Sequence, residues 1–75
     1  MNALILGAGK VGYSLASLLS GERHHVTVVE PNPERARVVE ESMDVRVVIG
    51  NGACSEVLDK CNIKSTDLLV AVTAN

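Results

Sequence analysis

Four short apolar runs alternate with segments of helical period, and no other feature of the sequence constrains the fold as strongly. The runs occupy residues 3–6, 26–29, 45–49 and 68–72. They are rich in Val, Ile and Leu, as expected for strands buried on both faces. The order βαβαβαβ with short connections predicts a parallel sheet with right-handed crossovers.

A doubly wound, Rossmann-like α/β fold of this length has strand order 3-2-1-4, with the first and fourth strands meeting at the switch point. We expect the first two helices on one face and the third on the other. Residues 68–72 then form an edge strand without charge, whereas Arg46 marks the opposite edge. We therefore expect one domain over residues 1–75, the first part of a longer domain, that pairs its edge or uncovered face with another copy.

The spacing of apolar residues predicts the first helix. Val11, Leu15, Leu18 and Leu19 recur at i, i+4, i+7 and i+8, which indicates one apolar face, and Gly21 is expected to end the helix.

The second and third helices carry their own signals. Asn32 is expected to cap a helix that has Pro33 at its first position, Glu34 in its first turn, and its end near Met43. A third apolar stripe predicts the third helix, through Cys54, Val57, Leu58 and Cys61.

Composition excludes several classes of protein. Hydrophobic residues make up 47% of the 75 residues, charged residues make up 21%, and the net charge is −2. There is no basic block, and Tyr13 is the one aromatic residue, so nucleic-acid binding is not expected. No apolar run approaches the roughly 20 residues that span a bilayer. We expect a cytoplasmic protein without direct membrane insertion.

The cysteines and histidines do not predict a metal site or a disulfide. Cys54 and Cys61 are seven positions apart, about 10 Å along a helix, which is too far for a disulfide. His24 and His25 are adjacent in an expected loop at the end of the sheet opposite the glycines. We expect two core thiols in a reducing compartment and no bound metal.

The stretch GAGKVG, residues 7–12, follows the first strand and opens the first helix. Gly7 suits the tight turn, Gly9 lets the backbone approach a pyrophosphate, and Gly12 lets the helix pack closely on the sheet. The helix N-terminus then offers free N–H groups to phosphates. Lys10 adds a charge, although a solvated lysine is the simpler interpretation.

Glu30 lies 18 residues after Gly12, at the end of the second strand. A carboxylate there accepts hydrogen bonds from ribose hydroxyls and repels a 2′-phosphate, which favours NAD or adenine nucleotides over NADP. The alternative is a solvated charge at a strand end. Arg35 is a candidate for a 2′-phosphate, but its position on a helix favours plain surface charge.

Four further residues lie where the third and fourth strands end, on the same side of the sheet. Asn51 and Gly52 follow the third strand and either meet the adenosine or supply a turn, while Ala71 and Thr73 flank the expected cleft. No Ser/His/Asp set or carboxylate pair converges there, and Tyr13 is expected to pack rather than to act as an acid. We predict no catalytic residue.

Four stretches resemble the N-terminal nucleotide-binding domain of regulators of potassium conductance and transport, the RCK or KTN family, in its TrkA-type form. They are ALILGAGKVGYSLASLL, VTVVEPNPER, DVRVVIGNGACSEVL and DLLVAVTAN, and they cover nearly the whole chain. Members of this family bind NAD(H) or adenine nucleotides, assemble as dimers or larger rings, and signal to a membrane potassium channel or transporter.

Carried onto this chain, the resemblance implies a set of nucleotide contacts: Gly7, Gly9, Lys10, Val11, Glu30, Asn51, Gly52, Ala71 and Thr73. The chain departs from the family in two ways. The acid at position 30 is glutamate rather than the common aspartate, and residues 1–75 do not include the further strands and second regulatory domain that family members usually have.

Two alternatives remain open. The chain is also similar to the opening segment of NAD-dependent oxidoreductases such as the saccharopine dehydrogenase-like enzymes. In addition, the glycines could serve packing alone, in a domain that binds nothing.

Overall fold

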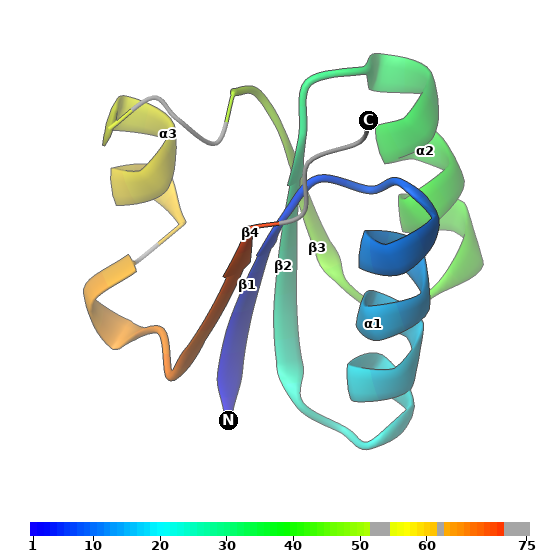
Figure 1. Cartoon of the computed structure of the whole chain (residues 1–75), viewed down its shortest axis with the longest axis horizontal. Coiled ribbons are helices and arrows are strands. Elements are labelled where there is room, and N and C mark those ends of the chain that lie inside the picture. The colour runs from blue at the N-terminus through cyan, green and yellow to red at the C-terminus, as the bar shows by residue number, and fades with distance from the viewer. Residues whose placement is uncertain (52–54, 62, 72–75) are drawn as a thin grey trace.

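The computed structural model describes residues 1–51, 55–61 and 63–71, without the side chains of residues 55 and 63. The chain forms a four-stranded parallel sheet of order β3-β2-β1-β4, as predicted (Figure 1). In chain order the elements are β1 Asn2–Leu6, α1 Lys10–Gly21, β2 His25–Glu30, α2 Pro33–Ser42, β3 Arg46–Ile49, α3 Ser55–Lys60, the 3₁₀ turn Ile63–Ser65 and β4 Leu68–Ala71. The α/β, Rossmann-like fold class is confirmed.

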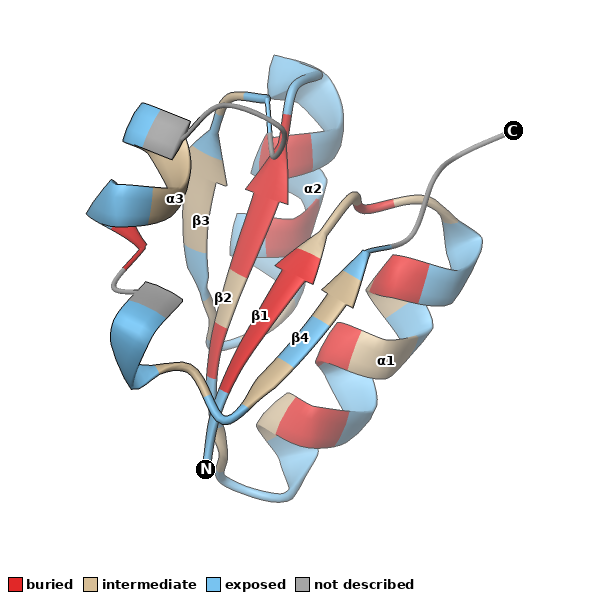
Figure 2. Ribbon diagram, turned by 60° about the vertical axis from the view of Figure 1, so that its left-hand side comes forward, coloured by how far each residue is buried: buried red, intermediate tan, exposed pale blue. Residues whose placement is uncertain are grey.

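Helices α1 and α2 cover one face of the sheet, and α3 lies on the other (Figure 1). The larger apolar cluster lies under α1 and α2; its members of lowest exposure include Ile5, Ala16, Val28 and Val39. The smaller cluster lies under α3 and joins Leu4 and Val29 to Cys61. The central strands β1 and β2 are the most deeply buried part of the sheet (Figure 2).

The inward face of α1 differs from the predicted one. The buried residues are Gly12, Ala16 and Leu19, whereas Val11 and Leu18 are 65% and 59% exposed. Small residues at positions 12 and 16 let the helix axis approach the sheet, and this close approach turns the helix so that the larger Val11 and Leu18 face outward. The prediction of one apolar face through Val11 and Leu18 was therefore wrong for these two residues.

Helix α1 ends at Gly21, as predicted, but the left-handed residue that closes it comes two positions later. Gly21 is its last residue, and the left-handed backbone falls on Arg23, at φ 66°. The N–H of His24 donates to the carbonyl of Leu19 at 3.2 Å, and that of Arg23 donates to Ser20 at 3.1 Å. This pair of bonds is a Schellman motif, in which glycine is the usual left-handed residue.

The predicted cap of α2 is confirmed. The side-chain oxygen of Asn32 accepts hydrogen bonds from the N–H groups of Glu34 and Arg35, at 2.9 and 3.3 Å, and Pro33 is the first helical residue. In α3, Val57 and Leu58 pack toward the sheet as predicted. Cys54 lies outside the described residues.

Both edges of the sheet have the predicted character. Arg46 is exposed on β3, and Leu69 on β4 is 50% exposed. His25 is the first residue of β2 rather than part of a loop, and Glu30 is the last. No helix in the described part of the chain is long and apolar enough to cross a membrane.

Candidate functional site

The loop between β1 and α1 lies at the carboxyl end of the sheet, next to the end of β2. The N–H of Gly7 donates to the carbonyl of Val29 at 2.8 Å, which ties the loop to the neighbouring strand. Gly7 has φ 108°, a conformation that side chains with a Cβ rarely adopt. Glycine is therefore required at position 7 to turn the chain from the strand into the helix.

Gly12 packs most closely against the backbone of this loop and also lies near the side chain of Ile5 on β1. A Cβ built on Gly12 would lie 2.1 Å from the carbonyl oxygen of Gly7, closer than any van der Waals contact allows. The first turn of α1 is thereby pressed onto the loop. The predicted close approach at Gly12 is confirmed, with the backbone of Gly7 as the group approached.

The N-terminus of α1 has no side-chain cap. Gly9 occupies the N-cap position with extended backbone, and its carbonyl accepts from the N–H of Tyr13 at 2.8 Å. The first-turn N–H groups, those of Lys10, Val11 and Gly12, precede the first intrahelical donor. Together with the helix dipole they form an anion-binding end of the kind that holds phosphates.

A hollow of about 490 Å³ lies beside the first turns of the helix. Its lining residues come from α1, from the glycine-rich loop and from α2, and they are Ala8, Gly9, Lys10, Tyr13, Ser14 and Arg35. A second hollow of about 240 Å³ shares Ala8, Tyr13 and Arg35 and continues along α2 past Glu34. The lining of the larger hollow carries two basic side chains and no acidic one, which suits a phosphate group.

Glu30 links the loop to the start of α2. Its side chain is 3% exposed; one carboxylate oxygen accepts from the N–H of Ala8 and the other from that of Asn32, each at 2.8 Å. Bonds from backbone N–H groups to a buried carboxylate are the strong, charge-assisted kind. The acid thus fixes the loop and the N-cap of α2 at the carboxyl end of the sheet.

Arg35 is an exposed residue on α2, in keeping with the interpretation as surface charge, but its position beside the glycine-rich loop was not predicted. Arg35 lies in the first turn of α2 and lines both hollows beside the glycine-rich loop. The signal was available, because the 3-2-1-4 strand order places the N-termini of α1 and α2 side by side at one end of the sheet.

The other predicted contacts lie around the same end. Ala71 is the last described residue of β4 and pairs with Leu6, the residue before the loop. Asn51 is exposed and follows Gly50, whose N–H donates to the carbonyl of Glu30 at 3.1 Å. Gly52 and Thr73 lie outside the described residues.

The remaining chemically active side chains do not gather at one end of the sheet. Tyr13 packs partly against the core and lines both hollows beside the glycine-rich loop, whereas His24 and His25 lie at the opposite end of the sheet. Cys61 is a free, buried thiol; burial raises its pKa, and the nearby Arg46 charge opposes that rise. Among the described residues, no cluster of three or more His, Cys, Asp or Glu side chains is placed to hold a metal.

Comparison with known proteins identifies the family of the chain. The TrkA-N domain family matches residues 3–75. The Trk system potassium uptake protein TrkA of Azorhizobium caulinodans is 38% identical over 73 residues, which make up 97% of this chain and 16% of that protein. The protein of the same name from Vibrio alginolyticus is 42% identical over the same shares of the two chains.

A third relative is shorter. The Trk system potassium uptake protein TrkA homolog of Pyrococcus abyssi is 38% identical over 73 residues, which are 97% of this chain and 32% of that protein. The chain thus spans about a sixth to a third of the length of these relatives. Since the family match covers nearly every residue, the chain belongs to the TrkA-N domain family.

Proposed function

We propose that this chain is the nucleotide-sensing domain of a potassium uptake system. It binds NAD(H) or an adenine nucleotide and reports the occupancy of that site without catalysing a reaction. The observation that carries the proposal is the uncapped N-terminus of α1, which lies beside a hollow lined by Lys10 and Arg35. The names of the relatives, which are potassium uptake proteins, support the assignment to transport.

The phosphates bind at the glycine-rich loop. N–H groups from Lys10, Val11 and Gly12 donate to the phosphate oxygens, and the side chains of Lys10 and Arg35 neutralise their charge. The full proposed contact set is Gly7, Gly9, Lys10, Val11, Gly12, Glu30, Asn51, Gly52, Ala71 and Thr73, and we add Arg35 to it because this residue lines the same hollow. No metal is needed to balance the charge.

Glu30 binds the ribose and sets the choice of nucleotide. Each carboxylate oxygen has a second lone pair besides the one that accepts from Ala8 or Asn32. A ribose hydroxyl can reach these lone pairs only if the loop or the start of α2 moves, because the side chain is 3% exposed. A 2′-phosphate would place negative charge against the carboxylate, so NADP is disfavoured.

This movement provides a mechanism of sensing. A nucleotide shifts the population of two states only in so far as it binds one of them more tightly. Here the two states differ in whether the loop and the start of α2 cover Glu30 or leave it open to the ribose. The start of α2 then moves with ligand occupancy and passes the change to a neighbouring subunit.

The proposed setting follows from the relatives. The domain works in the cytoplasm as a dimer or larger assembly, and its partner is a membrane potassium transporter subunit. The half-exposed Leu69 on the β4 edge offers apolar surface for such contacts.

Thermal unfolding with NAD, NADH, NADP, ATP, ADP and AMP tests the proposal. A ligand at 100 times its Kd adds about 2.7 kcal/mol, which raises the Tm of a domain this size by roughly 10–20 °C. We expect this shift with NAD or an adenine nucleotide and a smaller one with NADP. No shift with any of the six nucleotides contradicts the proposal.

Two variants test the named residues. Lys10→Gln, at an exposed position, is expected to weaken the binding of every nucleotide. Arg37→Gln, on the outer side of α2, removes the same charge and is expected to leave binding unchanged. Glu30→Gln is expected to narrow the preference for NAD over NADP, with the exposed Glu34→Gln as its control. An unchanged preference in Glu30→Gln contradicts the ribose role.

A further inference from the structure

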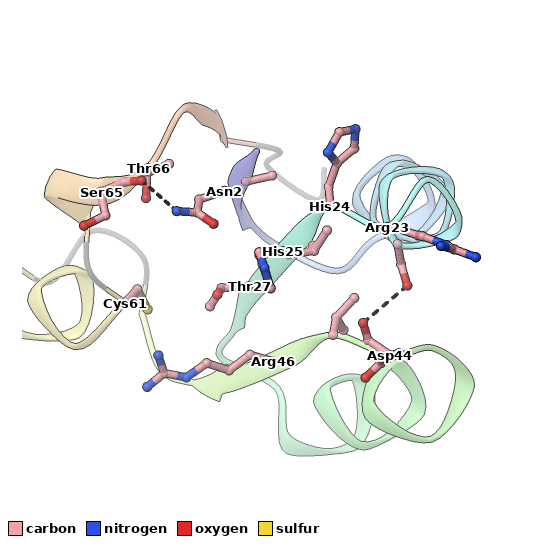
Figure 3. A pocket seen from close by; sticks show the side chains of 14 residues that line it. Asn2, Arg23, His24, His25, Thr27, Asp44, Arg46, Cys61, Ser65 and Thr66 are labelled. Carbon is pink, nitrogen blue, oxygen red and sulfur yellow. Dashed lines mark hydrogen bonds between the residues drawn. The ribbon is translucent and has the colours of Figure 1, made fainter.

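A third hollow, of about 530 Å³, lies at the end of the sheet where the strands begin, opposite the glycine-rich loop (Figure 3). Its side nearest α3, which we call the basal patch, is lined by Asn2, His25, Thr27, Arg46, Cys61 and Ser65. We propose that the basal patch binds a small oxyanion, a compound that carries phosphate or carboxylate groups. This site is independent of the nucleotide site.

The strand register brings the polar members of the patch together. Asn2 on β1 lies opposite His25 on β2, and Thr27 lies opposite Arg46 on β3. Side chains alternate along a strand, so these four share the face that carries Leu4 and Val29. The upper half of this face is the apolar cluster under α3, and the lower half is uniformly polar.

The donors of the patch are largely unused. A guanidinium has five N–H donors. Arg46 donates one hydrogen bond, to the carbonyl of Lys60 at 3.3 Å. Within the described part of the chain, Arg46 forms no ion pair with a carboxylate and the His25 ring has no hydrogen-bond partner. The Asn2 amide is oriented by a bond from its nitrogen to the carbonyl of Ser65 at 3.1 Å, which leaves a second N–H.

The charge of the patch favours an anion. Figure 3 shows Arg46 extending toward Cys61, with His25 and Thr27 between Arg46 and Asn2. Asp44, the carboxylate of the hollow, lies on its other side, near Arg23. A ligand on the α3 side therefore meets a guanidinium, an imidazole, an amide and a hydroxyl. Among the described residues, no acid lines this side of the hollow, and the nearby Asp67 carboxylate accepts from the backbone N–H of Asn2 at 2.8 Å.

Geometry points to phosphate or carboxylate as the recognised group. The planar fork of an arginine matches two oxygens of either group, and such bidentate pairs are both strong and directional. The volume is that of sites for small molecules, which span about 300–1,000 Å³. Because the strands are four to six residues long, the patch lies roughly 15–20 Å from the glycine-rich loop.

Nuclear magnetic resonance of the ¹⁵N-labelled chain tests the site. Inorganic phosphate and citrate are titrated separately at constant ionic strength, so that the two arms distinguish a phosphate from a carboxylate ligand. Saturable shifts of the Asn2, His25, Thr27 and Arg46 amides are expected with at least one anion. No saturable shift at these amides with either anion overturns the proposal.

Substitutions distinguish specific binding at the basal patch from a general attraction of anions to positive charge. Arg46→Gln is expected to raise the Kd at least tenfold, while Arg37→Gln, which removes the same charge from an exposed position on α2, changes it less than twofold. Equal weakening by the two variants overturns the proposal. Should Arg46→Gln fail to fold by circular dichroism, His25→Gln decides: a raised Kd supports the site, and an unchanged Kd overturns it.

Discussion

Replacing Gly12 with alanine tests how α1 is held against the glycine-rich loop. The new Cβ would lie 2.1 Å from the carbonyl oxygen of Gly7 and 3.1 Å from its carbon. A backbone oxygen has no alternative rotamer, so the helix or the loop must move by roughly 1 Å to restore a normal contact. Gly7 cannot yield easily, since its N–H is bonded to Val29 and its φ is 108°.

The magnitude follows from two opposing effects. Overpacking of this kind costs about 1–3 kcal/mol, and contact with backbone places Gly12→Ala at the upper end of that range. In the opposite direction, alanine stabilises a helix by about 1 kcal/mol relative to glycine. We expect the free energy of unfolding to fall by about 2 kcal/mol, the difference between these two terms.

Gly21→Ala is the matched control, because the same helix carries it and nothing lies within 4 Å of its added Cβ. It is expected to raise the free energy of unfolding by about 0.5–1 kcal/mol. Urea unfolding followed by circular dichroism measures both variants; with an m value of about 1 kcal/mol/M, the midpoint of Gly12→Ala falls by about 2 M. A Gly12→Ala midpoint at or above that of the unchanged chain refutes the close approach.

Three further predictions concern stability and reactivity. Arg23→Gly relieves the left-handed backbone at φ 66° and is expected to raise the unfolding free energy by up to about 1 kcal/mol in urea titrations; a loss would contradict the strain. Asn32→Ala removes the cap of α2 and is expected to cost about 0.5–2 kcal/mol by the same assay, and no loss would contradict the capping role. Burial raises the pKa of Cys61, because the buried site favours the neutral thiol over the thiolate. The neutral thiol therefore contributes its full stabilisation of the fold below the ordinary thiol pKa, and this contribution is lost as the pH rises above that value. Peptide mapping after iodoacetamide treatment at pH 8 should show slower alkylation of Cys61 in the folded chain than in urea, and equal rates would contradict its burial.

The sequence predicted those features that depend on local pattern. Apolar runs and helical spacing were enough for the strand order, the two layers of helices and the cap at Asn32, because each follows from neighbouring residues or from the general rule of right-handed crossovers. The glycine spacing likewise indicated the tight turn at Gly7 and the close approach at Gly12.

Features set by tertiary contacts were not predictable in this way. Periodicity identified an apolar face through Val11 and Leu18, but the approach of Gly12 to Gly7 determines which residues of α1 turn inward. The bonds from Ala8 and Asn32 to Glu30 join three separate segments. Likewise, Arg35 lines the hollow because α2 lies beside α1, and no local pattern specifies this arrangement.

Mapping a nucleotide onto the folded chain tests the central claim most directly. The ¹⁵N-labelled chain is titrated with NAD, and every backbone amide is followed. We predict saturable shifts across residues 7–12 and at Asn32, with NADP binding at least tenfold more weakly. Shifts that never saturate, or that leave both residues 7–12 and Asn32 unmoved, would contradict the assignment of this end of the sheet as a nucleotide sensor.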